Sequence, residues 1–101
     1  MINLDNFIAI NDKRPGQNRF KVFGTVTVAT PSVTPVLVEP AIRHKGGWEV
    51  LRLTLEDDGD VTLQALTEKP VYFERAGGTS WTQVEVDFPG GQHKLPIVTV
   101  E

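Results

Sequence analysis

The chain has 101 residues, no cysteine, and a formal net charge of −3 at pH 7. This length predicts one domain, residues 1–101, with a core that is stable without disulfides or metals. The missing cysteine excludes disulfides and thiolate chemistry, and the mixed, slightly acidic charge provides no basic field for nucleic acid. The N-terminal residues lack a secretion signal and no apolar run approaches ~18 residues, so we expect a soluble, cytoplasmic protein with no membrane contact.

The first predicted strand is Ile2 to Asn11. Its isoleucines and Leu4 share one parity, whereas Phe7 and Ala9 fall on the other, so the isoleucine side is predicted to face the core. Residues 11–18 are polar and rich in turn formers, which predicts a loop; its Lys13-Arg14 pair could contact an anion, but solvated loop charges are the favoured interpretation.

Residues Arg19 to Thr30 form the clearest single strand. The inward parity carries Phe20, Val22, Val26 and Val28, and Phe23 is the apolar exception on the outward side. Gly24 stands on the inward parity, where a missing side chain indicates a bend, a bulge or a closely approaching backbone.

The next segment, Val36–Arg43, is predicted to be a strand at a sheet edge, because Pro40 cannot donate to a ladder. Two strands, Trp48–Glu56 and Asp60–Leu66, then form a predicted hairpin around a three-residue loop, Asp57 to Gly59. This loop length sets leucines against apolar partners, with Leu55 opposite Val61, Leu53 opposite Leu63 and Leu51 opposite Ala65. A short helix over residues 61–69 is the alternative for the second arm, because Pro70 would end it.

A second hairpin is predicted from Val71–Ala76 and Trp81–Phe88. A four-residue loop would set Phe73 opposite Val84 and Val71 opposite Val86. The last strand is Lys94–Glu101, and Pro96 makes it another candidate for an edge.

These elements predict an all-β fold of about seven to eight strands, because turn signals recur every ~8–12 residues. An antiparallel β-sandwich of immunoglobulin-like architecture is the expected arrangement, and a small β-barrel is the alternative.

Residues that carry chemistry are few. His44 and His93 lie in glycine-flanked loops, the serines lie in loops, and no G-x-S-x-G motif accompanies them. The acidic turn at residues 56–60 lacks the ligand spacing of a calcium loop, and Glu74 and Glu85 are predicted as diagonal neighbours on a wet face. We therefore expect no enzyme activity, no metal site and no cofactor.

The informative anomaly is the placement of aromatic residues. Phe23, Trp48, Tyr72 and Trp81 all fall on outward parities, and the cationic loop before Trp48 adds Arg43 and His44 as binding candidates. These residues predict a non-catalytic binding module, most simply a protein-interaction or structural subunit that contacts a protein partner or a second copy. The alternative is a carbohydrate- or small-ligand-binding module, and aromatic rings that merely cap the core are a third interpretation.

Overall fold

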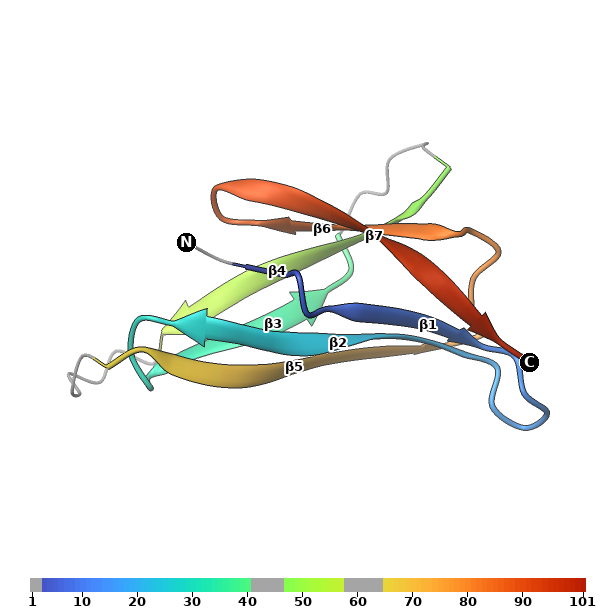
Figure 1. The fold of residues 1–101 in the computed structure, drawn as a ribbon, viewed down its shortest axis with the longest axis horizontal. Helices are drawn as coiled ribbons and strands as arrows, with labels where there is room; N and C mark the ends of the chain where they lie inside the picture. The colour runs from blue at the N-terminus through green and yellow to red at the C-terminus, as the bar shows by residue number, and fades with distance from the viewer. Residues whose placement is uncertain (1–2, 41–46, 58–64) are drawn as a thin grey trace.

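The computed structural model describes residues 3–40, 47–57 and 65–101 and confirms an all-β fold (Figure 1). Its strands are β1 (Ile8–Asp12), β2 (Arg19–Val28), β3 (Val33–Val38), β4 (Glu49–Asp57), β5 (Thr67–Ala76), β6 (Gln83–Phe88) and β7 (Gly91–Val100). Within these ranges there is no helix of the length and apolar character needed to cross a membrane.

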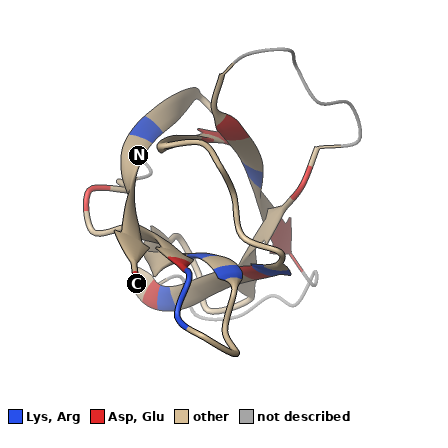
Figure 2. Cartoon of the chain, turned by 90° about the vertical axis from the view of Figure 1, so that its right-hand side faces the viewer, with Lys and Arg blue, Asp and Glu red and all other residues tan. Residues whose placement is uncertain are grey.

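The seven strands form one sheet in the order β3-β4-β6-β7-β1-β2-β5. The pairs β1–β7 and β4–β6 are parallel and the other neighbours are antiparallel. The end strands β3 and β5 contact each other, and Lys69 Nζ on β5 donates to the Pro31 carbonyl next to β3. Figure 2 looks along the long axis and shows the strands curving around a common interior. The sheet is therefore nearly closed, as in the small β-barrel that the sequence offered as an alternative.

Strand β7 joins the two halves of this sheet. Residues 91–96 pair with β6, and residues 97–100 pair with β1. The predicted edge position of Pro96 is wrong, because β7 lies in the middle of the strand order. Pro96 lies at the end of the β6–β7 ladder, where the lack of a backbone N–H donor is tolerated. The next residue is again hydrogen-bonded, since Ile97 N donates to Thr82 O (2.8 Å).

The inward parity of β2 is confirmed, since all four of its predicted core residues are buried. The close approach at Gly24 is also real, but the neighbours are side chains rather than backbone. A Cβ at this position would lie 2.3 Å from Phe7 Cδ1 and 2.7 Å from Asn6 Oδ1. The Asn6 amide continues the β1–β2 ladder, because it accepts from Thr25 N (2.7 Å) and donates to Thr25 O (3.1 Å).

The predicted parity of the first strand is wrong. Phe7, Ala9 and Asn11 face the core, whereas Ile8 is 47% exposed. The reason is a turn at residues 5–6, closed by a hydrogen bond from Phe7 N to Leu4 O (3.0 Å). The turn resets the alternation, so Leu4 is buried although it shares a parity with Ile8.

Strand β4 is confirmed, with Leu51 and Leu53 in the core. Its described neighbours are β3, where Leu37 lies opposite Leu53, and β6, where Val86 lies opposite Leu51. The predicted pairing of Leu51 with Ala65 is therefore wrong. Most of the predicted second arm and its turn, residues 58–64, lie outside the described residues, and Ala65 and Leu66 belong to no strand.

The second predicted hairpin is also wrong. Strand β5 pairs with β2 along its whole length, from Arg19 opposite Ala76 to Val28 opposite Thr67, and β6 lies between β4 and β7. The alternation of apolar and polar residues in β5 and β6 is the same whichever strand lies beside them, so it could not reveal their pairing partners. The predicted edge position is confirmed for β3, the first strand in the order, but β3 runs over Val33–Val38 and ends before Pro40, and residues 41–43 of the prediction lie outside the described residues.

Candidate binding site

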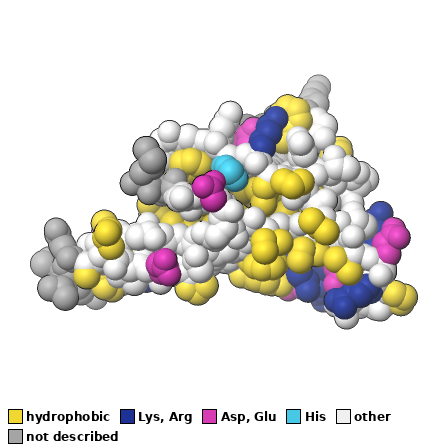
Figure 3. Space-filling view, in the orientation of Figure 1, with side chains coloured by type: hydrophobic (Ala, Val, Ile, Leu, Met, Phe, Trp, Pro, Cys, Tyr) yellow, Lys and Arg dark blue, Asp and Glu magenta, His cyan; other side chains and the backbone are white. Residues whose placement is uncertain are grey.

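The outward side chains of β7, β1, β2 and β5 form an apolar surface, here called the outer face. Ile8 lies opposite Phe23, which lies opposite Tyr72, so these three side chains cross three strands in one row. A parallel row begins with Val98 and Ile10. Ile8, Val98 and Tyr72 are 47%, 55% and 56% exposed. In Figure 3, hydrophobic side chains gather over this part of the molecule.

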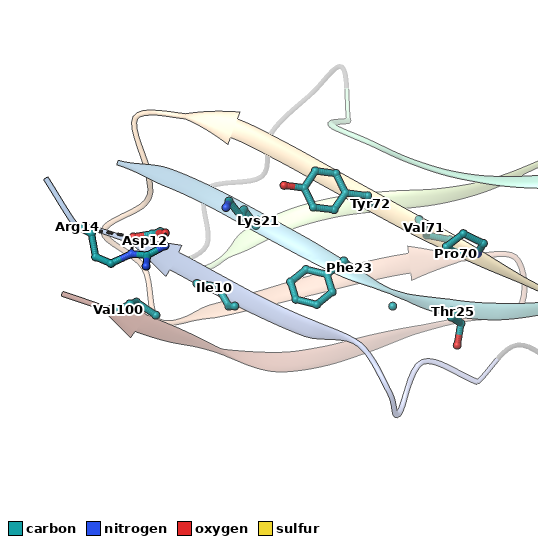
Figure 4. A pocket seen from close by; sticks show the side chains of 11 residues that line it. Ile10, Asp12, Arg14, Lys21, Phe23, Thr25, Pro70, Val71, Tyr72 and Val100 are labelled. Atoms are coloured by element: carbon teal, nitrogen blue, oxygen red, sulfur yellow. Dashed lines mark hydrogen bonds and ion pairs between the residues drawn. The ribbon is translucent and has the colours of Figure 1, made fainter. Parts of the chain in front are cut away.

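A groove of about 730 Å³ runs along the outer face. Figure 4 shows its lining: Ile10, Asp12, Arg14, Lys21, Phe23, Gly24, Thr25, Pro70, Val71, Tyr72 and Val100. The Phe23 and Tyr72 rings stack, with centroids 6.3 Å apart and an angle of 27° between their planes. The volume falls within the ~300–1,000 Å³ of small-molecule sites.

One end of the groove is polar. Arg14 Nη2 donates to Asp12 Oδ2 (2.7 Å), and Arg14 Nε and the Arg14 backbone N donate to Asp12 Oδ1 at 3.0 and 3.1 Å. The hydrogen bond from the Arg14 side chain lowers the pKa of Asp12 to about 2, against the opposing effect of burial. The carboxylate is thus ionised and largely neutralised by its own neighbour.

Arg14→Ala is expected to raise the pKa of Asp12 from about 2 toward the ordinary value of about 3.9. Because the folded-state pKa is depressed, the pair stabilises the protein above about pH 5 and loses this contribution as the pH falls through 2. Carboxyl carbon shifts, followed by NMR during acid titration, measure the change. Arg52→Ala is the matched control, because Arg52 is an exposed arginine on β4, which is not a neighbour of β1, and its removal should leave the Asp12 titration where it is.

The charges at this end do not balance. Asp12 is paired with Arg14, and Glu74 is paired with Arg19 (Arg19 Nη1 to Glu74 Oε1, 3.2 Å). Lys21 lies opposite Glu74 in the sheet, yet it forms no ion pair within the described part of the chain. The charged side chains that line the groove are the cations Arg14 and Lys21 and the carboxylate Asp12, so the lining carries one surplus positive charge.

The structure brings two of the predicted binding residues together, Phe23 and Tyr72. Trp48 immediately precedes β4, which is not a strand of the outer face, and the ammonium of Lys94 on β7 lies 3.8 Å from its ring centroid. Trp81 is exposed in the link between β5 and β6, and Thr79 Oγ1 accepts from its backbone N. The other two candidates, Arg43 and His44, lie outside the described residues.

Sequence reasoning missed four apolar residues and one cation of this site: Ile8, Ile10, Val98, Val100 and Lys21. A usable signal existed, because Ile8 to Ile10 and Ile97 to Val98 are apolar on both parities. A strand that is apolar on both sides must bury one face in the core and leave the other for a second contact.

A second polar cluster, here called the end network, lies at the end of the barrel where β5 stops. Arg75 donates from both terminal nitrogens to Glu49, at 2.7 and 3.2 Å, and Thr79 Oγ1 donates to Glu49 Oε2 (2.5 Å). Asn11 completes the cluster through Thr79 O (2.6 Å). The Glu49 hydrogen bond raises the pKa of Arg75. The polar groups of the end network form hydrogen bonds with one another, which is typical of side chains that hold neighbouring strands together.

Other groups are not arranged for chemistry in the described part of the chain. His93 lies in β7 opposite Val86, and no three histidine or carboxylate side chains of the described ranges are grouped as for a metal ion. Glu74 and Glu85 are on β5 and β6, which are not neighbours, so their predicted diagonal pairing is wrong.

No protein family model matches the chain, and searches of curated proteins and of solved structures found no significant match.

Proposed function

We propose that this protein is a non-catalytic binding module that acts as a protein-interaction or structural subunit. The supporting observation is the outer face, on which exposed and half-buried apolar side chains continue across four neighbouring strands. Contiguous apolar surface with charges at its margin is typical of interaction sites, because covering it removes apolar area from water. Self-association is the simplest form of this function.

The contact is proposed to be face-on rather than by strand addition. The end strands β3 and β5 contact each other, and β3 carries Pro35 within it. A partner strand would have to displace this closure before it could bond to either edge. The outer face requires no such rearrangement, because its side chains already stand away from the core.

We expect the wild-type mass to rise with concentration from 11.2 kDa toward about twice that value in sedimentation equilibrium. Val98→Asp should keep the protein monomeric, because it places a charge on the apolar face beside Ile10. Thr99→Asp is the matched control, since Thr99 is the next exposed residue on β7 and is not apolar. A wild type that stays at 11.2 kDa over the whole range contradicts self-association.

A small-ligand-binding module is the second candidate, and the concave groove beside Phe23 and Tyr72 favours it. A flat surface is sufficient for a protein partner, whereas a groove of this volume also accommodates a ring system. The carbohydrate form of this function would use Trp48 or Trp81 as stacking surfaces, and quenching of tryptophan fluorescence by sugars tests it.

A further inference from the structure

We propose that the groove on the outer face binds an apolar organic anion, a carboxylate or sulfonate carried on an aromatic or alkyl body. Lys21 would hold the anionic group, and the stacked Phe23 and Tyr72 rings would hold the body. This inference rests on the second proposed function, the small-ligand-binding module, and adds the charge and the shape of the ligand.

The charge follows from the ion pairs at the polar end of the groove. Both carboxylates there are occupied, Asp12 by three donors of Arg14 and Glu74 by Arg19. The surplus charge is the Lys21 ammonium, which lines the groove together with the apolar residues (Figure 4). A cation beside an apolar surface, within a protein whose net charge is −3, selects a ligand that ends in an anion.

The shape of the ligand follows from the positions of the side chains. In β2, Lys21 and Phe23 are two residues apart on the same side of the strand, about 7 Å along it. Tyr72 lies directly across from Phe23, and Pro70 extends the apolar surface along β5. An anionic group at Lys21 therefore places a body of one or two rings, or a short alkyl chain, over Phe23 and Tyr72.

Two fluorescent probes with the same ring system test the inference: anilinonaphthalene sulfonate, which is an anion, and N-phenylnaphthylamine, which is neutral. We expect the anion to bind the wild-type protein about fivefold more tightly than the neutral probe does. This factor corresponds to the attraction between two unit charges about 4 Å apart in water. Lys21→Met should remove this difference in affinity, because it weakens the binding of the anion only. Added salt should weaken the binding of the anion and leave the affinity for the neutral probe unchanged.

The matched control is Lys94→Met, which removes another exposed lysine from the Trp48 side of the barrel and should leave both affinities unchanged. Phe23→Ser should weaken the binding of both probes, because it removes one ring of the stacked Phe23–Tyr72 pair. Circular dichroism verifies that each variant is folded. Decanoate should displace the bound anion at lower concentration than decanol does.

The outcomes separate the two proposals. If both probes bind with equal affinity and Phe23→Ser weakens them, the small-ligand function holds and the preference for anions is wrong. If neither probe binds, or if Phe23→Ser changes neither affinity, the groove is not a ligand site and both proposals fail.

Discussion

Arg75→Met is expected to lower the free energy of unfolding by about 3 kcal/mol, the low end of the cost of breaking a buried ion pair. The substitution removes both hydrogen bonds that Arg75 donates to the carboxylate of Glu49, a residue that is only 5% exposed. It also removes the guanidinium that lies 5.2 Å from the Phe20 ring centroid. Urea denaturation at neutral pH measures the change.

Two further variants show whether the cost comes from the loss of the Arg75–Glu49 ion pair. Glu39→Gln alters the other carboxylate near Arg75, whose Oε1 is 3.5 Å from Nη1 and lies nearer the surface, and it should cost at most about 1 kcal/mol. The double variant Glu49→Met with Arg75→Met should recover much of the loss, because neither charge of this buried pair then remains. An Arg75→Met variant as stable as the wild type would show that the end network does not tie the strands together.

Gly24→Ala is expected to destabilise the fold by about 3 kcal/mol, the upper end of the usual cost of overpacking. The new methyl group would lie 2.3 Å from the ring of Phe7, which is itself buried against the core. It would also press on Asn6 Oδ1 at 2.7 Å and so disturb the amide that extends the β1–β2 ladder. Thermal and urea denaturation measure the loss.

Gly47→Ala is the matched control, because a Cβ there meets no atom within 4 Å and the backbone is not in the left-handed region. We expect it to be neutral or stabilising by about 0.4–1 kcal/mol. Combining Gly24→Ala with Phe7→Leu should cost less than the sum of the single changes, because the smaller side chain relieves the clash. Additive effects would mean that the Phe7 contact is not the source of the strain.

The parts of the fold that could be predicted are those in which one parity is apolar and the other polar. In β2 and β4 the leucines, valines and Phe20 alternate with threonine, arginine and lysine, and these strands have the predicted inward faces. The glycine on the inward side of β2 also gave a correct expectation of close packing, because the absence of a side chain is itself a steric signal.

The strand partners could not be predicted, because alternation specifies a face and not a neighbour. Connecting β5 to β6 by a hairpin is the shortest solution, but the chain crosses the barrel end through Gly77 and Gly78, both at positive φ. The candidate site depends on this topology. Phe23 and Tyr72 meet only because β5 pairs with β2, and Ile8 joins them only because the turn at residues 5–6 resets the parity of β1.

The central claim is that the outer face of β7, β1, β2 and β5 is the surface through which this protein binds. A proton–nitrogen correlation spectrum, recorded while anilinonaphthalene sulfonate is added, tests it most directly. We expect the shifted amides to cluster around Lys21, Phe23 and Tyr72, with the neighbouring residues of β1 following them. Shifts that instead cluster around Trp48 and Trp81, with the β2 and β5 amides unmoved, would contradict the claim.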